Sequence, residues 1–139
     1  MGNRAVITTE NDINNHGVGV YLHWNGGRDS VEGFLNYCEM KHYRPPEQDE
    51  YGWARLCQVI GNYFGGSTSI GVGLVDRLDT DNGDNGTYIV RDWKIVGRKY
   101  FKGREQKNHS LTDMLISIDE KQPLFEQIGT EAIIEGITK

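Results

Sequence analysis

Apolar and polar positions alternate with a period of two in several short stretches of the chain, and this period predicts β-strands. In Val18–Trp24 the aliphatic side chains share one face, while Tyr21 and His23 point to the opposite face. Ser69–Asp76 alternates in the same way, with two glycines on one face that let another backbone or a ligand come close. Further strands are predicted over Arg4–Thr9, Thr87–Val90 and Trp93–Val96, the last two as a hairpin turning at Arg91-Asp92.

Two longer stretches repeat apolar residues every three or four positions, which predicts amphipathic helices. The first covers Asp29–Tyr43; its first residue is expected to be the N-cap, with Glu32 in the capping-box position, and Pro45 follows its end. The second covers Asp49–Phe64 and is closed by two glycines. Both apolar stripes are expected to pack on the same face of the sheet.

The remaining segments are short and mostly polar. Glu10–Gly17 and Asp79–Gly86 are rich in Asn, Asp and Gly, which predicts turns and loops. Ser110 is expected to cap a short C-terminal helix that Pro123 interrupts, and Glu131–Lys139 is expected to be a poorly ordered tail. The 139 residues suit a single domain, 1–139, with an α+β fold: an antiparallel or mixed sheet of about five strands, with two main helices on one face.

Composition narrows the class of partner. The net charge of −5 argues against a nucleic-acid binder, because domains that neutralise phosphates are usually basic. No run is apolar enough for a membrane span or a signal sequence, so a cytoplasmic protein with no membrane partner is expected. Cys38 and Cys57 are then expected to be reduced, and no cofactor is expected. An exposed sheet edge would allow a homodimer.

Two sets of residues suggest metal ligands, but neither has the required spacing. Asp79–Gly86 resembles a calcium loop, yet in either register a glycine stands where an oxygen ligand is needed. Cys38 and His42 share a helix face that Cys57 and His23 could approach, but these spacings match no common zinc module. No metal site is therefore predicted; the alternative of a weak metal site in the polar loop stays open.

The first candidate binding site is the corner VYLHWNGGRDS, Val20–Ser30, where the second strand meets the first main helix. Its glycines bend the chain, and the first turn of the helix offers free N–H groups beside Arg28, which suits an anion. His23, Trp24 and Asn25 complete the candidate set of ligand-binding residues. The alternative is a structural corner, in which Trp24 covers the core edge and His23 bonds to a backbone carbonyl.

The second candidate is the basic and aromatic segment Arg91–Arg104, RDWKIVGRKYFKGR. Guanidinium groups such as those of Arg91 and Arg98 can hold a phosphate, and aromatic rings can stack on bases. Together with the first corner, this segment would form an anion or nucleotide contact. The alternative is a hairpin whose outer face is simply charged.

Three segments resemble a family of small uncharacterised proteins carried by phages and other mobile elements of Gram-positive bacteria. They are GNRAVITT at Gly2–Thr9, GVGVYLHWNGGRDSVEGFLNYC at Gly17–Cys38 and YGWARLCQVIGNYFGG at Tyr51–Gly66. The resemblance runs from Gly2 to about Arg104. The family has no established activity, so the resemblance implies no catalytic residue; it implies a bacterial cytoplasmic setting and an accessory role in a mobile element.

Two functions fit these features. The first is a non-enzymatic binding or accessory protein that holds an anionic, nucleotide-like ligand or a host protein partner, for instance as a sponge for a nucleotide signal. It is favoured because no nucleophile, base and orienting group are evident together. The alternative is an enzyme acting on a phosphorylated or nucleotide substrate, with His23 as general acid/base and Arg28 holding the phosphate.

Overall fold

The computed structural model of the protein describes residues 2–138, and within them a five-stranded mixed sheet forms one side of the molecule. The strands lie in the order β3-β2-β1-β4-β5; β1 and β4 are parallel and the other neighbours are antiparallel. The strands are β1 Ala5–Thr9, β2 Val18–Leu22, β3 Ile70–Leu74, β4 Thr87–Arg91 and β5 Lys94–Lys99. The predicted α+β class is confirmed, and of the two expected kinds of sheet, antiparallel or mixed, the structure has the mixed one.

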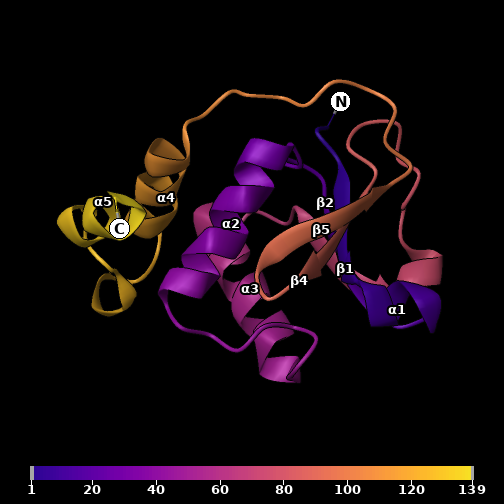
Figure 1. The fold of residues 1–139 in the computed structure, drawn as a ribbon, viewed down its shortest axis with the longest axis horizontal. Helices are drawn as coiled ribbons and strands as arrows, with labels where there is room; N and C mark the ends of the chain where they lie inside the picture. The colour runs from indigo at the N-terminus through magenta and orange to yellow at the C-terminus, as the bar shows by residue number, and fades with distance from the viewer. Residues whose placement is uncertain (1, 139) are drawn as a thin grey trace.

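The long helices form two layers beside the sheet (Figure 1). α2 and α3 pack next to the sheet, as predicted, while α4 and α5 pack against them as an outer layer. The α-helices are α1 Glu10–Asn14, α2 Arg28–Met40, α3 Glu50–Tyr63, α4 Leu111–Glu120 and α5 Thr130–Thr138. Two single-turn 3-10 helices within the described residues are η1 Val75–Arg77 and η2 Leu124–Glu126.

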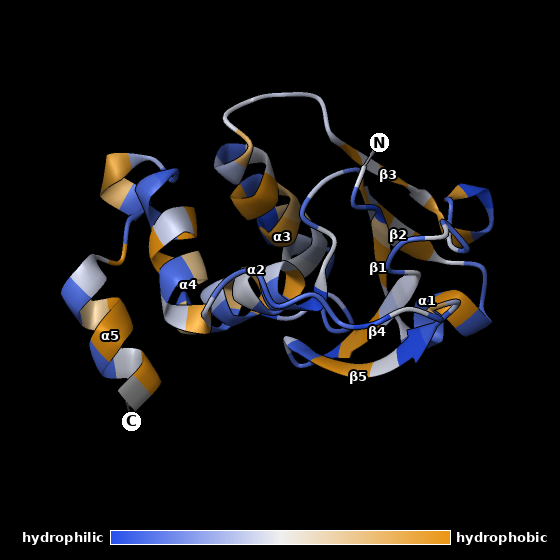
Figure 2. Ribbon diagram, turned by 90° about the horizontal axis from the view of Figure 1, so that it is seen from above, coloured by the Kyte–Doolittle hydropathy of each residue, from blue (hydrophilic) through white to orange (hydrophobic). Residues whose placement is uncertain are grey.

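The main core lies between the sheet and the two long helices. Ile7 and Val20 on the sheet, Phe34 on α2 and Ile60 on α3 are all fully buried in one cluster. Leu115 on α4 joins the same cluster, so the outer layer shares this core. Figure 2 shows apolar residues concentrated on the strands and on one side of each long helix. The faces expected from the sequence are therefore buried on β1, β2 and the long helices, whereas Val72 and Leu74 of β3 stay exposed.

The start of α2 differs from the expectation. The helix begins at Arg28, and its N-cap is Gly27, which has no side chain to accept a hydrogen bond. Asp29, the expected cap, lies inside the first turn, and its Oδ2 accepts the backbone N–H groups of Asn108 (2.5 Å) and His109 (3.0 Å). The predicted capping box is therefore wrong, because the Asp29 carboxylate instead holds the long connection between β5 and α4.

Two segments expected to lack regular structure are helical. The predicted turn after β1 contains α1, whose first turn is capped by the Thr9 hydroxyl, which accepts the Asp12 N–H (3.1 Å). The expected poorly ordered tail is instead α5 over Thr130–Thr138, while Lys139 lies outside the described residues. Ile133 of this helix is fully buried in the core, so the helix packs against the rest of the fold.

A buried carboxylate holds this C-terminal helix in place. Oδ1 of Asp119, at the end of α4, accepts the Tyr37 hydroxyl (2.6 Å) and the backbone N–H of Ile128 (2.7 Å). Its Oδ2 accepts the N–H of Gly129 (2.9 Å). The carboxylate therefore joins α2, α4 and the start of α5, and its burial is compensated by three donors.

Candidate functional site

The corner between β2 and α2 is bonded to the N-terminal segment by two backbone hydrogen bonds. The Asn3 N–H donates to the His23 carbonyl (2.8 Å), and the Gly26 N–H donates to the Asn3 carbonyl (2.8 Å). The Tyr21 hydroxyl and His23 Nδ1 share a hydrogen bond of 2.8 Å. The Trp24 ring stands edge-on to His23 with ring centroids 5.0 Å apart, and 45% of its surface is exposed. The His23 side chain therefore bonds to a tyrosine hydroxyl rather than to the backbone carbonyl expected for a structural corner, and Trp24 stays about half exposed.

The other two predicted corner residues already have partners. Asn25 has a left-handed backbone (φ 56°), and its side-chain amide donates to Ser30 Oγ (3.3 Å) and the Tyr63 hydroxyl (3.4 Å). Its amide therefore bridges α2 and α3 beneath the corner. Arg28 lies on the outer side, where its Nε pairs with Glu32 one helical turn later (2.7 Å).

Arg98 and Arg28 come together at Glu105. The Glu105 carboxylate pairs with Nη1 of Arg98, and its other oxygen lies 3.9 Å from Nε of Arg28. The Arg98 guanidinium lies between the rings of Tyr88 (4.0 Å) and Phe101 (3.8 Å), and its Nη2 is buried without a hydrogen-bond partner in the described structure. Sequence reasoning placed these two arginines in one site, and the structure does bring them together, with a carboxylate already between them.

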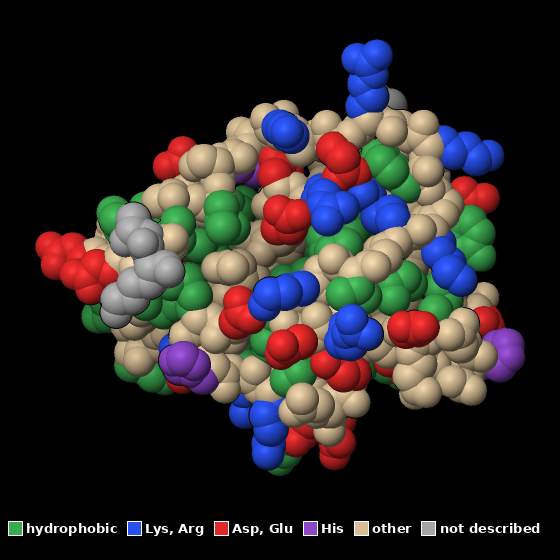
Figure 3. Space-filling model, viewed as in Figure 1, with side chains coloured by type: hydrophobic (Ala, Val, Ile, Leu, Met, Phe, Trp, Pro, Cys, Tyr) green, Lys and Arg blue, Asp and Glu red, His purple; other side chains and the backbone are tan. Residues whose placement is uncertain are grey.

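The depression beside these arginines does not suit an anionic ligand. It measures about 290 Å³ and is bordered by the carboxylates of Asp29, Glu32 and Glu105 against the cations of Arg28 and Lys107. Figure 3 shows positive and negative side chains interspersed over the face formed by α2, β5 and the connection that crosses them. The basic segment from residue 91 to 104 is therefore neutralised at this end by neighbouring acids.

Arg91 lies away from the other predicted site residues. It ends β4 opposite Lys94, whereas Arg98 pairs with Tyr88 at the far end of the same hairpin. Its neighbourhood is a separate depression of about 400 Å³ shared with α1 and Glu47. The six candidate residues therefore fall into three places: the His23–Asn25 corner, the two arginines at Glu105, and Arg91.

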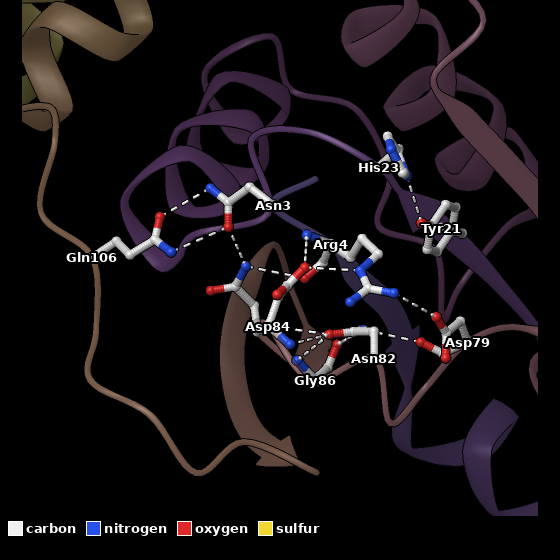
Figure 4. Close-up of polar contacts among 10 residues, drawn as sticks. Asn3, Arg4, Tyr21, His23, Asp79, Asn82, Asp84, Gly86 and Gln106 are labelled. Atoms are coloured by element: carbon white, nitrogen blue, oxygen red, sulfur yellow. Dashed lines mark hydrogen bonds and ion pairs between the residues drawn. The ribbon is translucent and has the colours of Figure 1, made fainter. Parts of the chain in front are cut away.

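The polar loop between η1 and β4 is organised by one buried side chain, Asn82 (Figure 4). Its Nδ2 donates to the carbonyls of Asp79 and Gly86, both at 3.0 Å. Its Oδ1 accepts the backbone N–H groups of Asp84, Asn85 and Gly86 at 3.0–3.1 Å. These hydrogen bonds account for the turn-rich sequence, and no group of three metal-ligating side chains gathers anywhere in residues 2–138.

An ion pair at this loop gives a pH-dependent prediction. The hydrogen bond from Arg4 Nε (2.8 Å) holds the pKa of Asp84 below its ordinary 3.8. The pair therefore stabilises the fold above about pH 4, and this contribution disappears as the pH falls through the lowered pKa. We expect Arg4→Gln to be less stable than the wild type at neutral pH, with the difference disappearing at a pH below the lowered pKa of Asp84 in denaturant titrations. A difference that stays constant down to that pH would contradict the assignment.

The two cysteines are free and differ in accessibility. Burial raises the pKa of both thiols, and Cys38, which is fully buried, is raised furthest. We expect iodoacetamide at about pH 8 to modify Cys57 slowly and Cys38 only after unfolding, because the thiolate is the reactive form. Peptide mass spectrometry measures both. Equal rates in the native protein would show that the helix carrying Cys38 opens.

A groove that sequence reasoning missed lies between α2, α3 and the segment around η2. Its volume is about 500 Å³, within the roughly 300–1,000 Å³ typical of small-molecule sites. It is lined by Tyr37, Lys41, Tyr43, Arg55, Gln58, Val59, Asn62, Gln122, Pro123, Phe125 and Glu126. Polar and aromatic side chains from three separate parts of the chain therefore converge here.

One wall of the groove is a polar stripe on α3. Arg55, Gln58, Val59 and Asn62 follow one another at helical spacing and so share one face of the helix. Asn62 Nδ2 donates to Gln122 Oε1 (2.9 Å), which fixes the far end of this wall. The side-chain amides of Gln58 and Asn62 each carry both donors and an acceptor, so this wall can bond to a polar ligand.

The opposite wall combines a cation with an exposed ring. Lys41, at the C-terminal end of α2, donates to the backbone carbonyl of Glu126 and lies 3.3 Å from its carboxylate. Phe125, which precedes Glu126 on η2, is 86% exposed although it borders the groove. An apolar ring left in solvent at the rim of a polar groove is available to cover a ligand.

The Arg55 guanidinium has no neutralising partner. Its Nη1 donates to Gln58 Oε1 (3.0 Å), and no carboxylate of the described residues lies within 4 Å. Its carbon lies 6.0 Å and 5.4 Å from the ring centroids of Tyr43 and Tyr51. A second depression of about 370 Å³ continues past this point, lined by His42, Tyr43, Arg44, Tyr51 and Arg55. Arg55 and Tyr43 belong to both depressions.

Tyr43 reaches the groove because α2 ends abruptly. His42 adopts a left-handed conformation (φ 60°), and the Tyr43 N–H bonds back to the Cys38 carbonyl (3.2 Å), which turns the chain across α3. Burial raises the pKa of Tyr43, so its hydroxyl is a neutral donor at physiological pH. The sequence does carry one signal of this groove. It is the polar stripe of α3, which lies beside the apolar stripe used to predict the helix.

No family model, curated protein or solved structure matches the chain. The resemblance of residues 2–104 to phage-borne proteins therefore stays a prediction, and the geometry of the site has to indicate the function by itself. Every helix between residues 2 and 138 is too short or too polar to reach across a lipid bilayer. The groove, rather than the corner at His23, then offers the better-formed site.

Proposed function

We propose that this protein is a non-enzymatic binding protein whose groove between α2, α3 and η2 holds a small anionic ligand with a flat ring, such as a nucleotide. The observation that carries the proposal is Arg55. Its guanidinium stands at the junction of two depressions, beside two tyrosine rings, and no carboxylate of the described residues lies within 4 Å of it. A partly buried cation of this kind gains from binding an anion.

The groove matches the parts of such a ligand. Arg55 would hold the anionic group of the ligand. Lys41 would bind the same group after giving up its ion pair with Glu126. The rings of Tyr43 and Phe125 offer stacking surfaces for a base, and stacking of a base on an aromatic ring contributes roughly 1–3 kcal/mol. The amides of α3 would bond to the polar edge of the ring.

Binding is favoured over catalysis by the side chains present. Among the described residues that line the groove, none is a serine, cysteine or histidine, and the Tyr37 hydroxyl donates to the buried Asp119. His42 lines only the adjoining depression. General acid/base chemistry by His23 would need a different site, since His23 bonds to Tyr21 away from the groove lining. Capture of a ligand needs no such groups.

The biological setting is proposed on the sequence alone. In a mobile element, such a protein would serve as an accessory factor in the bacterial cytoplasm that captures a nucleotide signal. This role rests on the resemblance of residues 2–104, and a host protein as partner remains the alternative occupant of the same surface.

The proposal is tested by isothermal titration with AMP and GMP, each compared with ribose 5-phosphate and inorganic phosphate. Ribose 5-phosphate keeps the sugar and the anion but lacks the base. We expect a nucleotide to bind at least about tenfold more tightly than ribose 5-phosphate, because the base adds stacking energy. Equal affinity for all four compounds, or no binding of either nucleotide, would overturn the proposal.

A further inference from the structure

The two edge strands of the sheet differ in how well they are protected against pairing with another chain. β5 carries Lys94, Arg98 and Lys99, and its register with β4 is interrupted by a bulge. β3, at the other end of the strand order, has the sequence IGVGL, with no charge, proline or bulge in its pairing with β2. Natural edge strands usually carry such features to prevent pairing with another chain. Figure 2 shows β3 at the margin of the sheet.

The hydrogen-bond pattern shows which backbone groups of β3 face outward. The His23 N–H donates to the Ser69 carbonyl (3.0 Å), and the Val75 N–H donates to the Gly17 carbonyl (2.8 Å). Bonded pairs alternate along an antiparallel ladder, so the odd-numbered residues of β3 direct their backbone groups to β2. The outward-facing groups are those of the even-numbered residues Ile70, Val72 and Leu74.

We propose that β3 pairs antiparallel with β3 of a second copy of this chain, about a two-fold axis at Val72. The strand is self-complementary about this residue: Ile70 falls opposite the Leu74 of the other copy, and glycine falls opposite glycine. The outward-facing groups of all three aliphatic residues then exchange hydrogen bonds across the axis. Such a contact is isologous and closes as a dimer.

The exposed side chains of β3 support a second copy as the occupant. Val72 is 62% exposed and Leu74 46% exposed, although their partners in β2 put them on the face that carries the helices. Pairing sets Val72 against its own copy and extends this apolar strip across the axis. No like charges meet within the paired strands, whereas the same two-fold pairing at β5 would bring lysines and arginines together.

The dimer is independent of the proposed ligand site, because no residue of β3 lines the groove. Two five-stranded sheets would join into one continuous sheet, with the groove of each copy left open. Dimer formation and nucleotide binding can therefore be tested separately.

A disulfide at the two-fold axis tests the register of the proposed pairing between the two copies of β3. In Val72→Cys the two Cα atoms of a hydrogen-bonded pair would lie about 5.5 Å apart, within the range of a disulfide. We expect rapid covalent dimers of Val72→Cys under mild oxidation, and none of Leu74→Cys, whose residue faces position 70 of the other copy. The wild-type chain controls for Cys38 and Cys57. Crosslinking of Leu74→Cys in preference to Val72→Cys would overturn the proposal.

The oligomeric state tests whether the protein dimerises through the β3 edge. Light scattering with size-exclusion chromatography should give the wild type twice its chain mass of 15.8 kDa. Val72→Lys places two ammonium groups opposite each other and should weaken the dimer at least about tenfold with little change in thermal stability. The matched variant Val96→Lys, at an exposed position on β5, should remain a dimer. A monomeric wild type at all concentrations, or a dimer lost only in Val96→Lys, would contradict pairing through β3.

Discussion

Replacing Asn82 with alanine is expected to lower the free energy of unfolding by about 4 kcal/mol. The substitution removes five hydrogen bonds and leaves the N–H groups of Asp84 and Gly86 and the Asp79 carbonyl without their partner. The Asn85 N–H and the Gly86 carbonyl keep their bonds to Arg4 and Val6. A buried polar group that loses its partner costs about 1–3 kcal/mol, and water entering the altered loop recovers part of the sum. Urea denaturation followed by circular dichroism measures the change.

The matched control is Asp81→Ala in the same loop. Asp81 is exposed, so its replacement should change the free energy of unfolding by less than about 0.5 kcal/mol. If Asn82→Ala is as stable as this control, the five hydrogen bonds do not organise the loop. A shared loss in both variants would instead point to the backbone of the loop rather than to the Asn82 side chain.

Replacing Arg55 with glutamine is expected to weaken nucleotide binding by about tenfold to a hundredfold. A hydrogen bond to a charged group contributes about 1.5–3 kcal/mol, and glutamine keeps a donor but loses the charge. Because Arg55 is only partly buried and pairs with no described carboxylate, the fold should keep its stability. Isothermal titration with AMP, alongside thermal melting of each variant, measures both quantities.

Arg77→Gln is the control for this loss of charge. Arg77 is an exposed arginine on η1, outside the groove, so its replacement changes the net charge equally without touching the site. Equal loss of AMP affinity in both variants would mean that overall charge, rather than contact with Arg55, drives binding. Retained affinity in Arg55→Gln would exclude Arg55 from the site.

Much of the fold follows from local patterns in the sequence. The alternation in residues 18–24 and 69–76 located β2 and β3, and the cap at Ser110 is present as predicted. At the β4–β5 hairpin the turn falls one residue later than predicted, because Asp92 and Trp93 both take positive φ. The buried Trp93 side chain donates to the Tyr43 carbonyl (2.7 Å), a long-range contact that no local pattern reveals.

The C-terminal helix and the α2 cap were missed for the same reason. The Asp29 carboxylate bonds to residues 108–109, about eighty positions away, and the Asp119 carboxylate bonds to the equally distant Tyr37 as well as to residues 128–129. A local reading assigns the first to a capping box and gives the second no role. Tertiary bonds of this kind decide where the chain is ordered, and sequence spacing does not encode them.

The candidate site was less predictable than the fold. Sequence reasoning grouped arginines with a glycine-rich corner, but it could not show that Glu105 already lies between Arg28 and Arg98. The groove joins residues from α2, α3 and η2, which are neighbours only after the helices pack. Within one helix, however, the spacing of Arg55, Gln58 and Asn62 does indicate a polar face, and that part of the site was open to prediction.

The most direct test of the proposed site is an amide NMR titration of the wild-type protein with AMP to saturation. We expect the largest shifts at Lys41–Tyr43 and Arg55–Asn62, which line the groove, with small changes at Tyr21–Arg28. Shifts confined to Tyr21–Arg28 would return the ligand to the corner predicted from the sequence and reopen a role for His23. An unchanged spectrum would contradict nucleotide binding altogether.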